Sequence, residues 1–198
     1  MKTLVVAITG ASGAVYARRL LEVLCEAGHP VRLSVSPAGA AVIQQELNVA
    51  RPQAAPSEII EELIAPWSEQ IETHPHTDLM APIASGSFPT AGMVVCPCSG
   101  GTLSAIAHGG SGNLIQRAAQ VHLKERRRLI LVPRETPLSL VSLENMKQAY
   151  LAGASILPAM PGWYHGVRSI DDLVDFVVAR ILDQLELEHR LMEPWGAS

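Results

Sequence analysis

The sequence predicts an α/β fold: a single three-layer α/β/α domain with a parallel sheet of the flavodoxin-like or Rossmann-like kind. Short, continuously apolar segments alternate with longer segments of helical periodicity, as in sheets whose strands are buried on both faces. The 198 residues suffice for one such domain with a substantial core. The chain contains no internal repeat and no second pattern of elements, so we expect one domain.

The first half of the chain begins with an apolar strand and a glycine loop. Val5 to Ile8 are continuously apolar, and TGASGA follows them before a helix with apolar residues at helical spacing. VRLSVS predicts a second strand, of alternating polarity. Residues 66–89 show no periodic pattern and predict a long functional loop. In order, we expect strands over 5–8 and 31–36, and helices over 12–26, 39–47 and 59–64.

The second half continues the alternation of strands and helices. GMVVCP and RLILVP are apolar enough to be buried strands, and ASILP predicts a shorter, late strand. Ser169 is a good N-cap for the last helix, and Asp171 and Asp172 favour the positive end of the helix dipole. In order, we expect strands over 92–97, 128–133 and 154–158, and helices over 98–107, 114–126, 141–152 and 169–187.

The composition excludes several classes of function. A net charge of −4 and few aromatic residues argue against a nucleic-acid-binding surface. No apolar stretch approaches ~20 residues, so we expect no membrane span. Three cysteines without metal-ligand spacing predict reduced thiols in the cytosol and no bound metal. Only 17% of the residues are charged, which indicates that much of the surface is buried in a homo-oligomer.

Two strand-to-helix loops are rich in glycine, and in a parallel sheet such loops share one edge. In residues 10–14 the glycines permit a tight turn, and the next helix offers unpaired N–H groups to an anion. Because Gly-x-Gly-x-x-Gly is absent, the loop lacks the dinucleotide signature. In residues 99–102 two hydroxyls surround two glycines, which can hold a phosphate through backbone N–H groups. Each loop also fits an ordinary turn, but two on one edge favour a mononucleotide.

A third loop places Arg134 and Glu135 directly after a buried strand. The arginine can pair with a phosphate, and the glutamate beside it can move protons; the alternative is a solvated loop. Arg117 and Lys124 lie seven residues apart on one predicted helix and therefore share a face. Basic residues at the end of that helix also complement its C-terminal dipole, which is the alternative interpretation.

Four segments together resemble the UbiX-type flavin prenyltransferases: ITGASGAVYARRLLEVL, IASGSFPTAGMVVCPCS, NLIQRAAQVHLKERRRLILVPRETPLSLVSLENM and RSIDDLVDFVVARILDQL. The resemblance runs from about Lys2 to Leu187, and its most specific part combines RAAQVHLKERR with RETPL. It implies a flavin prenyltransferase (flavoprotein) domain over residues 1–187, followed by a C-terminal tail over 188–198. It also implies a cytoplasmic, metal-independent enzyme assembled as a dodecamer.

The resemblance further implies the substrates. Family members join the dimethylallyl group of dimethylallyl phosphate to the central-ring nitrogen of reduced FMN and close a fourth ring onto the neighbouring benzenoid carbon. The product, prenylated FMN, serves UbiD-type decarboxylases. Two alternatives remain open. One is a flavin-dependent decarboxylase of the related Cys-decarboxylase type. The other is a non-catalytic FMN carrier, which Gly100 and Gly101 would suit because they replace the side chains usual in the family.

The resemblance also implies roles for individual residues. In catalysis, Ser12 would orient the flavin nitrogen and Glu135 would handle the proton, with Arg117 and Lys124 in the polar cluster around the phosphate. The flavin would be bound by Gly10, Ala11, Ser12, Ser36, Ser99, Gly100, Gly101, Thr102 and Arg134. The prenyl phosphate would be bound by Tyr164, Arg180, Lys124, Glu46 and Trp195. Loop packing for Tyr164 and a solvated position for Arg180 are the alternatives.

Overall fold

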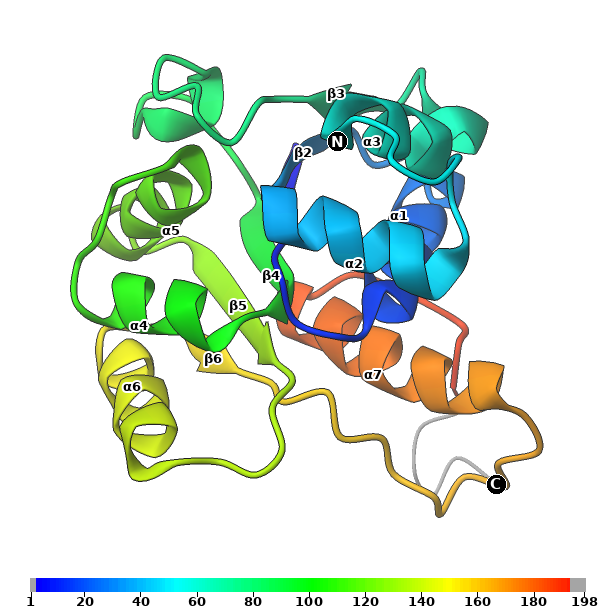
Figure 1. Cartoon of the computed structure of the whole chain (residues 1–198). Coiled ribbons are helices and arrows are strands. Elements are labelled where there is room, and N and C mark those ends of the chain that lie inside the picture. The colour runs from blue at the N-terminus through cyan, green and yellow to red at the C-terminus, as the bar shows by residue number, and fades with distance from the viewer. Residues whose placement is uncertain (1–2, 193–198) are drawn as a thin grey trace.

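Six strands form one parallel sheet. They are β1 (Leu4–Ile8), β2 (Val31–Val35), β3 (Ile71–Thr73), β4 (Gly92–Cys98), β5 (Arg128–Pro133) and β6 (Ser155–Ile156). Their order across the sheet is β3-β2-β1-β4-β5-β6, and each neighbouring pair is parallel (Figure 1). The computed structural model describes residues 3–192, so the predicted site residue Trp195 lies outside the described residues.

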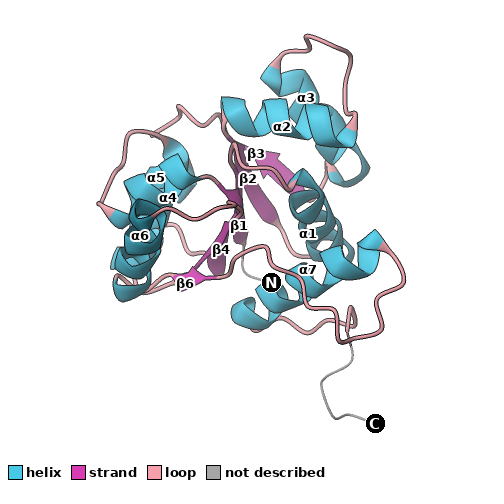
Figure 2. Ribbon diagram, turned by 60° about the horizontal axis from the view of Figure 1, so that its bottom comes forward, coloured by secondary structure: helices cyan, strands magenta, loops and turns pink. Residues whose placement is uncertain are grey.

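Helices cover both faces of the sheet, which confirms the three-layer prediction (Figure 2). One face is covered by α1 (Ala14–Glu26), α2 (Pro37–Leu47), α3 (Pro56–Ile64) and α7 (Ile170–Leu185). The other face is covered by α4 (Gly100–Ala107), α5 (Leu114–Lys124), α6 (Leu140–Leu151) and the 3-10 helix η2 (Pro82–Ala84). A second 3-10 helix, η1 (Ala65–Trp67), follows α3.

The central strand β1 shows why the strands are apolar throughout. Leu4, Val6 and Ile8 pack into the core beneath α1 and α7, whereas Val5 and Ala7 pack into the core beneath α4 and α5. Every side chain of β1 is therefore buried, and a polar residue at any of these positions would lose its contact with water. Continuous apolar patterning predicts such a strand correctly.

The chain reverses its direction of progress across the sheet between β1 and β4. From β1 the chain continues to β2 on one side, and from β4 it continues to β5 on the other side. The loops after β1 and β4 therefore diverge to opposite faces and leave a crevice beyond the carboxyl ends of these strands. This topological switch point is where ligands bind in open parallel sheets.

Two expectations about the strands β2 and β3, on one side of the sheet, are wrong. The strand over 31–36 was expected to alternate, but in β2 only Arg32 keeps partial exposure, because its guanidinium pairs with Glu72 and lies 5.6 Å from the ring centroid of Phe88. Residues 66–89 were expected to be irregular, but they contain β3. This strand has only three residues, one of them buried, so no sequence pattern marks it.

A buried histidine makes the stability of the fold depend on pH. The His122 side chain is fully buried; its Nε2 lies 2.9 Å from Thr90 Oγ1 and its Nδ1 lies 2.7 Å from the Ala118 carbonyl oxygen. Burial, helped by the nearby charge of Arg127, lowers the pKa of His122 from 6.5 to about 4, against the opposing hydrogen bond to Ala118. The folded protein therefore holds this imidazole neutral at pH values where the unfolded chain would protonate it.

We expect the free energy of unfolding to fall by about 3 kcal/mol between pH 7 and pH 4 through this one group. The unfolded state binds the extra proton below pH 6.5, so the stability is present above that value and is lost as the pH approaches 4. Urea denaturation at several pH values measures the slope. His122→Gln, which keeps polar atoms but does not titrate, should flatten it; an equal slope in that variant would contradict the assignment.

Candidate functional site

One buried threonine joins the ends of β1 and β4. Thr9 Oγ1 donates to the Pro97 carbonyl oxygen at 2.9 Å and accepts the Ser99 N–H at 2.8 Å. The Thr9 backbone N–H also donates to the Pro97 carbonyl oxygen, at 3.2 Å. Thr9 is 1% exposed, so this clamp sets the spacing of the loops after β1 and β4. Sequence reasoning missed Thr9; a hydroxyl ending a buried strand just before a glycine loop was the available signal.

We expect Thr9→Val to lower the free energy of unfolding by about 1–2 kcal/mol, because it removes a hydrogen-bonded hydroxyl from a buried position and leaves the half-buried Ser99 N–H without its acceptor. Valine nearly matches threonine in shape, so the change removes the hydroxyl and little else. Thr9→Ser is the matched control, since it keeps Oγ, and it should retain most of the stability. Equal loss in both variants would mean that the methyl group, not the clamp, matters.

Two N–H groups at the N-terminus of α1 already have a carboxylate partner, so this helix offers fewer donors to an anion than expected. Glu46 Oε2, from α2, accepts the N–H groups of Gly13 at 2.9 Å and Ala14 at 2.8 Å. Burial alone would raise the pKa of Glu46, but hydrogen bonds from the Ser12 side chain and from these two N–H groups, with the charge of Arg134, hold it below its usual value. A protein carboxylate therefore already occupies the positive end of this helix.

The three loops predicted to share one edge do converge there. Arg134 Nε donates to the Ser12 carbonyl oxygen at 3.1 Å, which ties the end of β5 to the loop after β1. A Cβ atom added to Gly100 would lie 4.0 Å from Glu135 Oε2, which places the start of α4 beside the same strand end. The clamp through Thr9 completes the contact between the first two loops. The prediction that these loops are neighbours is confirmed.

Two other helix N-termini at this edge are capped by serine. Ser36 accepts the Gly39 N–H of α2 at 3.0 Å, and Ser99 accepts the Thr102 N–H of α4 at 3.4 Å. A helix N-terminus has four N–H groups without intrahelical partners, so capping one of them leaves donors for a phosphate.

Glycine is required at Gly10, where an added Cβ would lie 2.5 Å from the Cβ of Ala38. An added Cβ at Gly101 would meet nothing within 4 Å, so the approach to α4 is open.

Lys124 does not join this cluster within one chain, contrary to expectation. Lys124 ends α5 just before β5 begins, whereas Arg134 follows the other end of β5. Six extended residues separate these ends by roughly 20 Å. Lys124 Nζ lies 3.5 Å from Glu125 Oε1, and Arg117 Nε donates to the Ala84 carbonyl oxygen at 3.0 Å. Because α5 and β5 run in opposite directions, Lys124 and Arg134 lie at opposite edges of the sheet although they are close in sequence.

Tyr164 and Arg180 lie along one face of α7. The Tyr164 ring meets the ring of Phe176 edge to face, with centroids 5.8 Å apart. Phe176 and Arg180 are four residues apart on α7 and therefore neighbours on its surface. Arg180 is half exposed and its Nη1 donates to Asp183 Oδ2 at 2.6 Å. The structure thus places both predicted phosphate ligands on the same helix surface.

Glycine loops and capped helix N-termini at the switch point of a doubly wound sheet define a nucleotide-binding α/β protein. The Flavoprotein family model matches residues 1–182 of the chain. The flavin prenyltransferase UbiX of Halalkalibacterium halodurans is 49% identical over 191 residues, covering 96% of this chain and 92% of that protein. The chain therefore belongs to the flavoprotein family and, within it, to the UbiX-type flavin prenyltransferases.

Two solved structures are similar over nearly the whole chain. AnUbiX (PadA1), in complex with FMN and dimethylallyl pyrophosphate, is 40% identical, with a TM-score of 0.87 and coverage of 100% of this chain and 98% of that one. A dodecameric FMN-dependent UbiX-like decarboxylase from Escherichia coli O157:H7 is also 40% identical, with a TM-score of 0.86 and coverage of 98% and 100%. These likenesses confirm the predicted flavodoxin-like fold.

The described residues offer neither a metal-binding cluster nor a membrane-spanning helix. Residues 3–192 contain no cluster of three or more His, Cys, Asp or Glu side chains placed to hold a metal ion. Among the helices of the same part of the chain, none is long and apolar enough to cross a membrane.

The three cysteines are buried free thiols. Burial raises the pKa of Cys25 to about 11 and that of Cys98 to about 12.

Proposed function

We propose that this chain joins the dimethylallyl group of dimethylallyl phosphate to reduced FMN and releases prenylated FMN. The observation that carries the proposal is the meeting of Arg134 with Ser12 and of Glu135 with Gly100 at the switch point. That edge combines phosphate-binding N–H groups with a carboxylate able to move a proton. Full-length similarity to flavin prenyltransferases and to a structure holding FMN and an allylic diphosphate supports it.

The residues of this edge fit FMN. The N-termini of α2 and α4, with the hydroxyls of Ser36 and Thr102, would offer donors to its phosphate, and Ser99 donates to Thr102 Oγ1 and so orients that hydroxyl. Gly10 keeps the first loop close to α2, and the open space over Gly100 and Gly101 leaves room for a planar ring system. Ala11, Ser12 and Arg134 would border the bound flavin, and Arg134 Nε donates to the Ser12 carbonyl oxygen. When bound, reduced FMN supplies the nucleophilic nitrogen and carbon that accept the five-carbon group.

The protein's task at the other substrate is to stabilise a departing phosphate. Breaking the carbon–oxygen bond places negative charge on the phosphate, and preorganised donors and cations lower the energy of that charge separation. Tyr164 and Arg180 on the surface of α7 would hold this phosphate, with Arg117 and Lys124, and Glu46 and Trp195 would border it. No metal is needed because side-chain cations neutralise the leaving group.

Glu135 is the group that would receive the proton when the fourth ring closes. It lies beside the start of α4 and one residue after Arg134. A carboxylate within hydrogen-bond reach of a ring carbon can accept its proton, with the released phosphate as the other acceptor at hand. Ser12, whose side chain bonds Glu46, would orient the flavin nitrogen.

The proposed site requires a homo-oligomer, for which we propose a dodecamer. Lys124 lies at the opposite edge of the sheet from Glu135, so it must come from a neighbouring subunit if both act on one phosphate. Large exposed apolar side chains gather on α6, as expected of a surface covered by another subunit. They are Leu140, Val141, Leu143, Tyr150 and Leu151. The dodecameric assembly of the similar Escherichia coli protein supports this number.

The product would pass to a UbiD-type decarboxylase in the cytoplasm. Prenylated FMN is a modified cofactor and needs an acceptor apoenzyme, so this chain would act upstream of a decarboxylation. The buried, unpaired cysteines suit a reducing compartment.

The proposal is tested by incubating the purified chain with reduced FMN and dimethylallyl phosphate without oxygen, followed by mass spectrometry of the flavin. We expect the flavin to gain one five-carbon unit. Unchanged flavin mass with tight FMN binding would indicate a carrier, and release of CO₂ from a peptidyl cysteine would indicate a decarboxylase. Either result would overturn the proposed reaction.

A further inference from the structure

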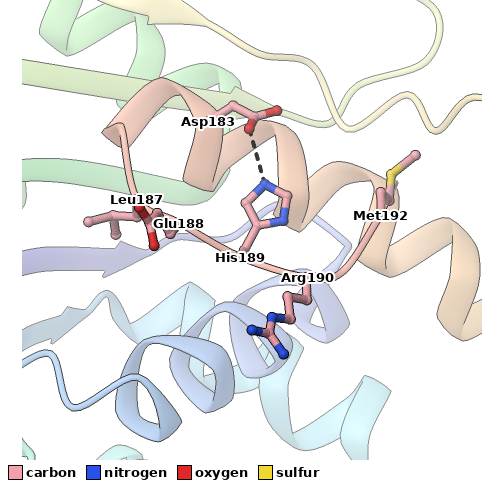
Figure 3. A pocket seen from close by; sticks show the side chains of 6 residues that line it. All are labelled: Asp183, Leu187, Glu188, His189, Arg190 and Met192. Carbon is pink, nitrogen blue, oxygen red and sulfur yellow. Dashed lines mark hydrogen bonds and ion pairs between the residues drawn. The ribbon is translucent and has the colours of Figure 1, made fainter. Parts of the chain in front are cut away.

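The chain turns back on itself after α7. Glu186 adopts a left-handed conformation (φ 56°), its N–H donates to the Asp183 carbonyl oxygen at 3.0 Å, and the Leu187 N–H donates to the Leu182 carbonyl oxygen at 3.0 Å. Residues 187–192, which we call the returning segment, then run alongside α7 in the opposite direction (Figure 3). Leu187 and Leu191 pack against the core beneath α7. The segment is therefore held to the helix that carries Arg180.

One carboxylate of α7 contacts both Arg180 and the returning segment. Asp183 Oδ2 accepts from Arg180 Nη1 at 2.6 Å, and Asp183 Oδ1 lies 3.0 Å from His189 Nε2 (Figure 3 shows the second contact). The His189 side chain is only 11% exposed, whereas Arg180 and Asp183 are 53% and 40% exposed. The buried imidazole fixes one oxygen of Asp183, which leaves the other oxygen directed at the arginine.

The hollow beside these residues explains why a specific contact is needed. A pocket of about 550 Å³ separates part of the returning segment from α7; its lining is Asp183, Leu187, Glu188, His189, Arg190 and Met192 (Figure 3). Within residues 3–192 no side chain fills this space, so close packing among them does not orient Asp183. The hydrogen bond from His189 does so instead.

We propose that Asp183 is a positioning residue for Arg180, and that His189 in turn positions Asp183. This inference rests on the proposed function, in which Arg180 holds the prenyl phosphate. Arginine has five N–H donors in a planar fork, and Asp183 accepts only from Nη1, so Nε and Nη2 remain for the phosphate. A long, half-exposed arginine otherwise samples many rotamers, and restricting it before binding lowers the entropic cost of gripping the ligand.

The negative charge of Asp183 also repels a phosphate, so Asp183 has two opposing effects on phosphate binding. Asp183 and Arg180 are both substantially exposed, and water and salt screen the repulsion between charges that do not touch. By contrast, Asp183 orients Arg180 through a direct hydrogen bond, and water and salt do not screen that contact in the same way. We therefore expect the loss of the Asp183 carboxylate to weaken phosphate binding rather than strengthen it.

The test measures the dissociation constant of dimethylallyl phosphate by calorimetry on the FMN-loaded protein, together with KM and kcat for prenylation. We expect Asp183→Asn to weaken binding and raise KM about three- to fivefold, since an exposed ion pair contributes up to about one kcal/mol, which is a fivefold change. We expect kcat, FMN affinity and thermal stability to stay near those of the parent. His189→Phe should act in the same direction, and His189→Gln, which keeps a donor, should restore most of the affinity.

Glu188→Gln is the matched control: it removes a carboxylate from the same segment and pocket but has no contact with Arg180 in the described residues, and binding should not change. Unchanged or tighter binding in Asp183→Asn would overturn the inference, as would equal loss in the control. If Arg180→Ala leaves binding unchanged, Arg180 is no phosphate ligand and the inference fails with it. If the parent makes no prenylated FMN but binds dimethylallyl phosphate with the expected dependence on Asp183, the proposed function fails and the inference stands.

Discussion

Replacing Glu135 with glutamine is expected to reduce formation of prenylated FMN by about 10²- to 10⁴-fold, the range that a positioned general base contributes. An amide has nearly the shape of a carboxylate but cannot accept the proton that ring closure releases. FMN should still bind, because the proposed contacts to its phosphate come from the N-termini of α2 and α4. Single-turnover assays followed by mass spectrometry of the flavin measure the rate, and fluorescence quenching measures FMN affinity.

The matched control for this change is Glu61→Gln. Glu61 is an exposed glutamate of α3, on the opposite face of the sheet from α6, and its replacement should leave the rate within about twofold. A Glu135→Gln variant that keeps more than a tenth of the parent rate would show that the released phosphate, or another group, takes the proton. A carrier without chemistry would have no turnover to lose in either variant.

Lys124→Ala and Glu135→Gln chains are each expected to be impaired, and combining them in one oligomer is expected to restore part of the activity. If Lys124 and Glu135 of one site come from different subunits, oligomers that combine Lys124→Ala chains with Glu135→Gln chains contain some sites with both side chains intact. Random one-to-one mixing in a symmetric assembly leaves about a quarter of the sites complete. Co-expression of the two variants with different affinity tags, followed by two-step purification and a prenylation assay, measures the recovered fraction.

The control mixture combines Glu135→Gln chains with chains that carry both substitutions. No site in that mixture contains an intact glutamate, so it should remain as inactive as the single variant. An inactive first mixture, with oligomers shown to contain both chains, would place Lys124 and Glu135 in the same subunit or remove Lys124 from the reaction. The geometry of the single chain, with these residues at opposite edges of the sheet, makes restoration the expected result.

Patterns along the chain determined most of the fold. Val5 to Ile8 had to form a strand buried on both faces, because no water-facing residue interrupts the run. The start of the last helix was also predicted, since Ser169 caps α7 as expected. The convergence of residues 10–14, 99–102 and 134–135 followed from topology alone, because strand-to-helix loops of a parallel sheet share one edge.

Only the tertiary structure decided which polar groups meet at that edge. Sequence could not show that Glu46 fills the N-terminus of α1, since the two segments are more than thirty residues apart and their contact depends on how α2 packs. It could not show that Thr9 clamps β4. The position of Lys124 at the opposite end of β5 does follow from the order of α5 and β5, although the resemblance implied otherwise. Local patterns report the conformation of a segment and which side of it avoids water, whereas distances between side chains of different segments arise from packing.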